Sequence, residues 1–268
     1  MKLSEVKSIL VNNGYEVEER TVNKNGYSVE ALSVGSGSIR PSIYEKTVEN
    51  MEDEDELLAF VSRIIDGVPE VNVSLIQDKD YILEHCRSCI RHESDDDTIV
   101  KWQVWDDLEE YIRIELGSER GGNMSCVVTK ALMSSLDIDE DELRMHARLN
   151  LREHVSIKSM AQVLAELMGQ VPSEIGSMDE VMYVACTDDK SYAASVMLLE
   201  DVLQDFCLEH SIDSLVIIPS SVNEIILIAP RNMDDEAINS MIREVNETQV
   251  DEWERLSDHC YRFEPIAA

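Results

Sequence analysis

Short apolar runs separated by tight polar turns are the feature that most constrains how this chain folds. The segment IIPSSVNEIIL (residues 217–227) places two apolar runs around a polar centre. A second pair of runs, YEVEERTV and YSVEALSV, alternates apolar and polar residues on either side of a turn that contains Asn25 and Gly26. An Asn-Gly turn between alternating runs is typical of a two-residue β-hairpin loop. The pattern therefore predicts antiparallel hairpins near both ends of the chain.

Helical segments alternate with these hairpins. Apolar residues spaced three and four apart predict helices in residues 5–13, 56–68, 78–94, 137–154, 156–169, 191–211 and 233–248. Further strands are predicted in residues 98–105, 109–116, 124–129, 181–187 and 259–265. This mixture indicates an α+β protein with mixed, mostly antiparallel sheets and helices packed on one side, rather than a doubly wound sheet. We expect an N-terminal part (residues 1–122) and a C-terminal part (residues 123–268), because the pattern changes after the turn SERGGN.

The chain carries a large excess of negative charge. Its 268 residues include 23 Lys or Arg and 55 Asp or Glu, which gives a formal net charge of −32. The excess is spread along the chain, with −14 in residues 1–122 and −18 in residues 123–268. Such a surface repels nucleic acids and anionic lipid headgroups and attracts basic partners. The alternative interpretation is that the charge serves solubility or reflects an acidic host proteome.

Composition points to a cytoplasmic protein. No run of 18 apolar residues occurs, so a transmembrane helix is not expected. The first residues, MKLSEVKSIL, lack the apolar core of a signal peptide because Glu5 and Lys7 interrupt it. The 6 cysteines are scattered through apolar surroundings, which is typical of reduced thiols rather than of a secreted disulfide scaffold.

Several motifs of the C-terminal half resemble one known family. The stretch LVIIPSSVNEIILIAP contains its IPSS-x-x-E hairpin, and MIREVNETQVDEWERLSDHCYRF contains a helix ending in VN and a closing LSD-x-x-Y. The segment RPSIYEKTVENM is similar to its N-terminal P-x-IY segment. The family is domain of unknown function family 5688, an uncharacterised group of clostridial and gut-bacterial proteins. The resemblance implies a bacterial, intracellular, single-chain α+β protein and implies no activity.

The two serines of the IPSS motif have two interpretations. A nucleophile elbow reads G-x-S-x-G at a strand-to-helix turn, whereas Pro219 and Val222 flank the serines here and a second strand follows. A nucleophile also needs a base and an orienting acid, and His259 lacks supporting context. The pattern favours a four-residue hairpin loop, residues 220–223, whose hydroxyls bond backbone amides.

Loops on a rigid scaffold often carry binding contacts. We therefore treat four residues of this loop and its exit as candidates for contact with a partner: Ser220, Ser221, Asn223 and Glu224. A hydrolase or transferase site around Ser220 and Ser221 is the alternative.

Two pairs of residues have the spacing of zinc ligands. Cys86-x-x-Cys89 and Cys207-x-x-His210 would each share one face of a helix, and together could form a Cys3His site. Neither pair has the tight glycine turn usual in zinc knuckles, and buried cysteine is common in protein cores. We therefore expect no metal and no cofactor, and keep these four residues as the alternative.

Carboxylates form clusters in three places. Residues 137–142 resemble a calcium loop but lack its central glycine, and Arg148 stands where the twelfth-position glutamate is needed. We interpret that cluster as a helix start. The others lie in charged loops and are candidates for contact with a basic partner: Asp95, Asp96, Asp97, Asp106 and Asp107.

These observations favour a protein that acts by binding. The sequence contains no G-x-G-x-x-G, no Walker loop, no H-E-x-x-H and no kinase motifs. We predict an acidic, non-enzymatic interaction protein that binds a basic partner. In a more specific form of this hypothesis, the partner is itself a nucleic-acid-binding protein. A narrower form of the hypothesis is a nucleic-acid mimic or an inhibitor of a defence system, which requires a contiguous acidic face.

Overall fold

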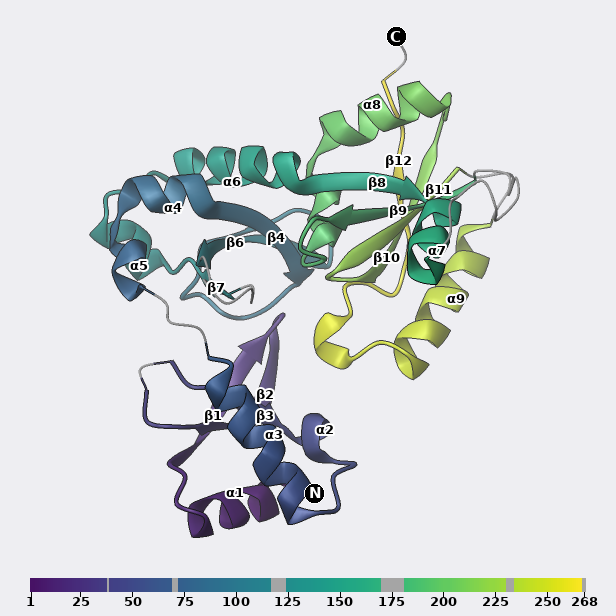
Figure 1. Ribbon diagram of the computed structural model, residues 1–268. Helices are drawn as coiled ribbons and strands as arrows, with labels where there is room; N and C mark the ends of the chain where they lie inside the picture. Colours follow the sequence, from purple (N-terminus) through teal and green to yellow (C-terminus); the bar gives the residue numbers. More distant parts are fainter. Residues whose placement is uncertain (38, 69–71, 117–123, 170–180, 230–233, 267–268) are drawn as a thin grey trace. The chain divides into compact units, whose positions relative to one another are not determined.

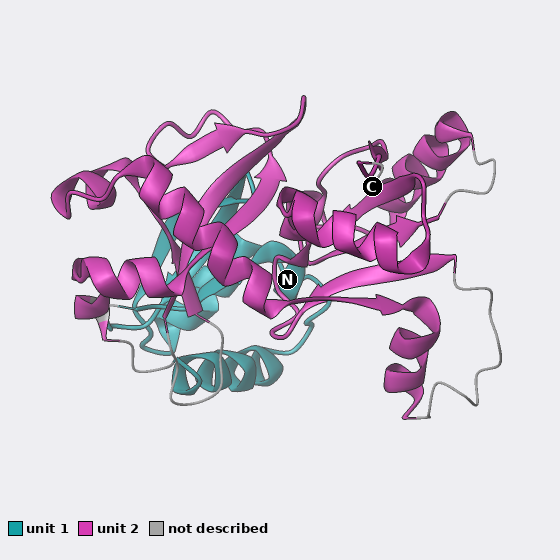
Figure 2. Ribbon diagram, turned by 90° about the horizontal axis from the view of Figure 1, so that it is seen from above, with its two compact units in different colours: residues 1–71, 118–122 teal, residues 72–117, 123–268 magenta. Residues whose placement is uncertain are grey.

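The computed structural model describes residues 1–37, 39–68, 72–116, 124–169, 181–229 and 234–266 (Figure 1). The chain divides into two compact units, unit 1 (residues 1–71 and 118–122) and unit 2 (residues 72–117 and 123–268) (Figure 2). This division differs from the expected boundary at residue 122, because β6 (Leu108–Leu116) and β7 (Met124–Val127) pair antiparallel across that point.

Unit 1 packs two longer helices against a small antiparallel sheet. Its elements are α1 (Leu3–Asn12), β1 (Val17–Lys24), β2 (Tyr27–Val34), β3 (Ser42–Tyr44), α2 (Glu45–Val48) and α3 (Glu54–Asp66). β2 lies between β1 and β3. Asn25 (φ 50°) and Gly26 (φ 89°) adopt the left-handed conformation that a type I′ loop requires, so the predicted hairpin is confirmed. The core contains Val6, Leu10, Leu32, Val34, Ile43, Val48, Leu57 and Val61.

Unit 2 begins with a four-stranded antiparallel sheet. Its elements are η1 (Val73–Gln77), α4 (Lys79–His85), β4 (Cys86–His92), β5 (Lys101–Gln103), β6, β7, α5 (Lys130–Ser135) and α6 (Glu140–His154). β6 is central: it pairs with β4 on one side and with β5 and β7 on the other. Asp139 caps α6 by accepting hydrogen bonds from the amides of Asp141 and Glu142, as the helix-start interpretation predicts.

A five-stranded antiparallel sheet completes unit 2, in the order β12-β10-β11-β9-β8. Its elements are β8 (Val155–Ser159), α7 (Met160–Met168), β9 (Met182–Thr187), η3 (Ala193–Leu198), α8 (Glu200–His210), β10 (Leu215–Ser221), β11 (Glu224–Ile228), α9 (Asp235–Thr248), η4 (Glu252–Glu254) and β12 (Tyr261–Phe263). The α+β class with antiparallel sheets is confirmed. None of the described helices has the length and apolar character needed to cross a membrane.

Helices cover both faces of the five-stranded sheet, so the expectation of helices on one side needs correction. Phe206 of α8 packs with Tyr183 and Ile217 on one face. On the other face, Ile238 of α9 packs with Val216, the neighbour of Ile217 in β10. Because successive side chains of a strand point to opposite faces, a strand that is apolar at every position needs a cover on both.

The predicted helix over residues 78–94 is correct only as far as His85. Asp78 caps α4 through the amides of Asp80 and Tyr81, but residues Cys86–His92 form β4. All seven residues of β4 pair with β6, from Cys86 opposite Ile114 to His92 opposite Leu108. Helical periodicity in the local sequence is therefore overridden by a pairing with a strand further along the chain.

Two other predicted helices begin later than expected. Residues Val155–Ser159 pair with β9, and the helix starts only after Ser159, which caps α7 in a capping box with Gln162. Within the predicted helix 191–211, residues Ala193–Leu198 form η3 and α8 follows. The Ser195 hydroxyl, which is fully buried, accepts a hydrogen bond from the Ile90 amide at 3.0 Å. β4 is an edge strand, and η3 satisfies an amide that its ladder leaves unpaired.

A buried carboxylate ties α6 to the four-stranded sheet. The side chain of Glu110 in β6 has no exposed surface, and it accepts hydrogen bonds from Ser88 (2.8 Å), Arg144 (2.8 Å) and Arg148 (2.6 Å). Burial by itself would raise the pKa of Glu110, but the hydrogen bonds from Arg148 and Arg144 outweigh it and hold the pKa below its usual value. Glu110 is therefore charged at neutral pH.

Glu110→Gln is expected to lower the free energy of unfolding by about 3 kcal/mol, the lower end for breaking a buried ion pair, because the arginines are partly exposed. A lowered pKa adds stability above the unfolded-state value of 4.5, and that stability is lost as the pH falls through the folded-state pKa. The difference between wild type and variant, measured by urea unfolding, should thus be largest above pH 4.5 and shrink below it. Glu153→Gln, an exposed position on α6, is the control. An equal effect of both variants would contradict the assignment.

Candidate functional site

A cluster of four polar side chains joins the two sheets of unit 2. Asp107 directly precedes β6, and Tyr261 begins β12, where it pairs with Ile217 of β10. The Tyr261 hydroxyl donates to Asp107 Oδ1 at 2.5 Å, and His259 Nδ1 lies 3.8 Å from Asp107 Oδ2. Ser257 Oγ lies 2.8 Å from the same nitrogen of His259. We call these residues, Asp107, Ser257, His259 and Tyr261, the Asp107 cluster.

The cluster is sheltered on one side and open on the other. Ser257 is buried, whereas the side chains of Asp107 and His259 are 24% and 43% exposed. The ring of Trp105 lies 5.6 Å from that of Tyr261. Burial, and then the hydrogen bond to Asp107, raise the pKa of Tyr261, so its hydroxyl keeps its proton at neutral pH and acts as a donor.

The arrangement does not match a catalytic triad. In a triad the serine and the carboxylate bind opposite nitrogens of the histidine, so that the ring can move a proton from one side to the other. Here Ser257 and Asp107 both approach Nδ1 of His259. Ser257 also accepts a hydrogen bond from the His259 amide at 3.3 Å, which is a local turn contact. The geometry is that of a polar joint between two sheets with an exposed imidazole.

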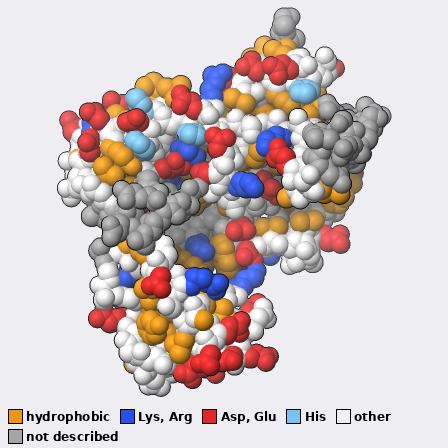
Figure 3. Space-filling view, viewed as in Figure 1, with side chains coloured by type: hydrophobic (Ala, Val, Ile, Leu, Met, Phe, Trp, Pro, Cys, Tyr) orange, Lys and Arg blue, Asp and Glu red, His pale blue; other side chains and the backbone are white. Residues whose placement is uncertain are grey.

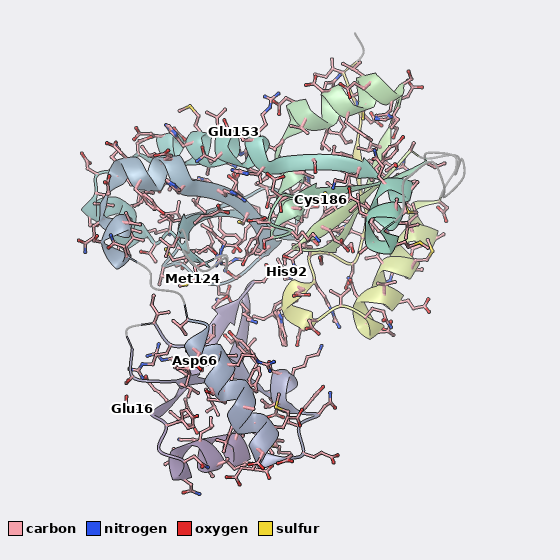
Figure 4. The ribbon with its side chains drawn as sticks, viewed as in Figure 1. Glu16, Asp66, His92, Met124, Glu153 and Cys186 are labelled. Atoms are coloured by element: carbon pink, nitrogen blue, oxygen red, sulfur yellow. The ribbon has the colours of Figure 1, made fainter. Side chains whose placement is uncertain are left out.

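The C-terminal segment (residues 252–261) is fastened at several points. Asn246 of α9 donates to the Ser257 carbonyl at 3.0 Å and to the Asp258 carboxylate at 2.8 Å. His92, which ends β4 and is labelled in Figure 4, lies 3.2 Å from the carbonyl oxygen of Leu256 through Nδ1. The VN and LSD-x-x-Y motifs therefore meet in space, because Asn246 holds the turn that positions Ser257.

The hairpin between β10 and β11 contacts the same segment. The Val222 amide donates to the Glu254 carbonyl at 3.0 Å, and the Ala194 amide donates to the Val222 carbonyl at 3.3 Å. The Asn223 side chain accepts a hydrogen bond from the amide of Tyr192, whose φ of 55° is unusual for a residue other than glycine. Asn223 thus helps to hold a left-handed residue in place.

The loop of this hairpin is shorter than predicted. β10 runs through Ser220 and Ser221, and β11 begins at Glu224, so Val222 and Asn223 alone form the turn. An irregularity in the pairing between Ile218 and Ser221 absorbs the difference. Ser221 Oγ accepts a hydrogen bond from the Asn223 amide at 3.1 Å, as the turn interpretation expects.

The predicted acidic residues are only partly brought together. Asp107 is in the cluster, and its carbonyl accepts a hydrogen bond from the Glu93 amide at 3.0 Å, where the loop with Asp95–Asp97 begins. Hydrogen bonds from Thr98 lower the pKa of Asp96, against a weaker opposing effect of burial. The Asp96 carboxylate is therefore bonded within its own loop. The side chains that remain exposed are Asp95, Asp97 and Asp106.

The four residues kept as alternative zinc ligands lie on different elements and have different surroundings. Cys86 and Cys89 stand on β4 rather than on a helix, so their odd spacing points them to opposite faces. Cys86 lies beside Asn150 of α6, while Cys207 is on the buried side of α8, in the core. His210 lies 3.3 Å from the Tyr183 hydroxyl. Within the described residues, no group of three or more His, Cys, Asp or Glu side chains is arranged to hold a metal ion.

Sequence reasoning named Asp107 and His259 but not their partners. The structure pairs His259 with Ser257 rather than with Ser220 or Ser221. In the sequence, Ser257 and Tyr261 are marked only by the LSD-x-x-Y motif. The Asp107–Tyr261 hydrogen bond joins residues 154 positions apart, and no local pattern signals such a contact.

Asp107→Asn is expected to lower the free energy of unfolding by about 1 kcal/mol, because it replaces a charge-assisted hydrogen bond with a neutral one. Asp106→Asn removes the same charge at the adjacent exposed position and should change stability by less than about 0.5 kcal/mol. Urea unfolding of both variants measures the difference. Equal effects would mean that the Asp107–Tyr261 contact contributes nothing.

Cys86 and Cys89 should be unreactive in the native protein. Burial raises the pKa of each thiol from 9.0 to about 12. Their contribution to stability is present below pH 9 and lost as the pH rises toward 12. Iodoacetamide at about pH 8.5, followed by peptide mass spectrometry, should label neither residue in buffer and both in urea. Labelling of either in the native state would show that β4 opens.

Comparison with known proteins places the chain in one family. The model of a family described as "Family of unknown function (DUF5688)" matches residues 3–265. No curated protein and no solved structure matches the chain. Because the match spans nearly the whole sequence, including the segments that form the Asp107 cluster, the chain belongs to the family of unknown function DUF5688.

Proposed function

We propose that this protein is an acidic, non-enzymatic interaction protein that binds a basic partner, such as a nucleic-acid-binding protein. The observation that carries the proposal is that Lys and Arg side chains are paired with carboxylates within the chain. Lys and Arg side chains throughout the described residues form ion pairs with carboxylates of the same chain, among them Lys7, Arg20, Arg40, Lys79, Arg87, Arg91, Lys101, Arg144, Arg148, Arg152, Lys158, Arg243 and Arg262.

Many carboxylates of the described residues face solvent. The chain has 55 acidic side chains against 23 basic ones, and the buried pairs take up few of them. Exposed carboxylates gather at the start of α3, in residues Glu54–Glu56, and in the loops with Asp95, Asp97 and Asp106. A surface with spare negative charge and few free cations speeds association with a basic protein and disfavours acidic ones.

The nucleic-acid mimic is the less supported form of this proposal. A mimic needs carboxylates in a contiguous array, because the phosphates of a duplex are regularly spaced. On the face seen in Figure 3, Asp and Glu side chains form several separate groups within each unit. The groups are interrupted by apolar and uncharged surface, which suits a protein partner of mixed character.

The enzymatic alternative has little geometric support. Ser221 bonds the Asn223 amide, and His259 bonds Ser257, so the contacts that would activate Ser220 or Ser221 are directed elsewhere. We also propose a cytoplasmic location. All six cysteines are free thiols, which suits a reducing compartment.

An affinity pull-down from nuclease-treated host lysate tests the proposal. A basic protein should be retained at low salt (about 50 mM) and released at high salt (about 500 mM), because screening weakens contacts between charged surfaces. Mass spectrometry identifies what elutes. Retention of nothing at low salt would overturn the proposed function.

A matched pair of triple variants tests where the contact lies. The first carries Asp95→Asn, Asp97→Asn and Asp106→Asn; the second carries Glu16→Gln, Glu49→Gln and Glu52→Gln, which are exposed positions in unit 1. Both lose three negative charges. A stronger loss of retention in the first variant supports contact through the loops beside the Asp107 cluster, and equal losses would indicate that only net charge matters.

A further inference from the structure

One flank of α9 carries apolar side chains that nothing in the described structure covers. Ile238, Ile242 and Asn246 are buried against the sheet and the C-terminal segment. Met241 and Val245, one helical turn apart, are 51% and 47% exposed. Amphipathic helices normally turn such residues inward, so an exposed apolar pair on a well-anchored helix marks a contact surface.

The position of this pair around the helix follows from the contacts of its neighbours. Asn239 accepts a hydrogen bond from the Cys260 amide at 2.8 Å, and Asn246 bonds the carbonyl of Ser257, so that side of α9 faces the C-terminal segment. Met241 lies roughly 150° around the helix from both asparagines, at 100° per residue. It therefore points along the sheet, away from β12 and toward the β11–β9 side.

An exposed methionine of the sheet lies on this same face. Met182 in β9 is 39% exposed and stands directly opposite Ile228 of β11. Ile228 packs beneath α9 with Ile238 and Ile242. Cross-strand neighbours share a face, so Met182 lies on the face of the sheet that α9 covers. We call Met182, Met241 and Val245 the α9 surface.

Within the described residues, exposed carboxylates lie beside the α9 surface. Asp234, Glu244 and Glu247 are exposed on the helix or at its start. The one cation of α9, Arg243, is paired with Glu236 at 2.7 Å. By contrast, the other exposed apolar pair at helical spacing, Met145 and Leu149 of α6, stands on a helix that also carries several arginines.

We propose that the α9 surface docks a cationic amphipathic helix of the partner. Its apolar side would lie on Met182, Met241 and Val245, and its Lys or Arg side chains would meet the carboxylates of α9. Methionine suits such a surface because its flexible, polarisable side chain adapts to different apolar shapes. A basic helix with an apolar face is a recurrent ligand of acidic, methionine-bearing surfaces. This inference rests on the proposed function and names the segment that the partner presents.

A designed peptide tests the inference directly. The probe is a fluorescent Lys/Leu peptide of about five helical turns with all leucines on one face. Two other peptides serve for comparison. One has the same composition in scrambled order, and the other is an oligolysine of the same charge. Fluorescence anisotropy at low salt should give a Kd for the amphipathic peptide about tenfold lower than for the scrambled one, because only the former presents a continuous apolar face.

Paired variants locate the binding surface. Met241→Gln with Val245→Gln should weaken binding of the amphipathic peptide about tenfold, because glutamine keeps the helix but removes the apolar contact. Met145→Gln with Leu149→Gln is the matched control, since those side chains are 54% and 53% exposed on α6. It should change the Kd by less than about twofold. Circular dichroism checks that both variants fold.

The remaining outcomes separate the two proposals. If all three peptides bind alike and the α9 variant has no effect, the docking inference is overturned while charge-based binding stands. If no cationic peptide binds and the lysate yields nothing, the proposed function fails as well. If sedimentation equilibrium finds a wild-type dimer that the α9 variant abolishes, the occupant is a second copy of this chain, which also overturns the inference.

Discussion

Unit 2 depends on the pairing of β4 with β6. Seven consecutive residues pair, and the ladder sets where each side chain of β4 points. Ser88 reaches Glu110, which brings in the arginines of α6; Ile90 donates to Ser195 of η3; and His92 contacts the carbonyl of Leu256. Residues of this one strand thus bind a buried carboxylate, donate a backbone amide to η3 and contact the C-terminal segment. Such a strand tolerates little change of register, because a shift by one residue would reverse all of these contacts.

The same ladder explains why the Asp107 cluster lies where the two sheets meet. Asp107 stands at the beginning of β6 and Tyr261 at the beginning of β12, so each side chain is held by a strand of a different sheet. The hairpin turn at Val222 and the asparagine of α9 then fix the segment between them. With this support, the exposed side of His259 and the nearby acidic loops form the solvent-facing part of the joint.

Charge is sorted between the inside and the outside of the molecule. Arg91, Arg144 and Arg148 are used to neutralise the buried carboxylates of β6. These pairs remove cations and carboxylates together, so the excess of carboxylates over cations stays outside the core. A net negative charge of this size repels other copies of the chain and attracts proteins of opposite charge, which is the physical basis of the proposed function.

Local sequence determined those elements whose signals are short-range. The Asn25-Gly26 loop, the Asp139 cap of α6 and the strands β9, β10 and β11 follow from conformational preference, capping and short continuous apolar runs. The tertiary structure alone decided that residues 86–92 form a strand, that α8 starts after η3 and that Asp107 meets Tyr261. Each of these depends on pairing or burial against residues far along the chain. The stabilisation gained there exceeds the small local preferences that a sequence pattern reports.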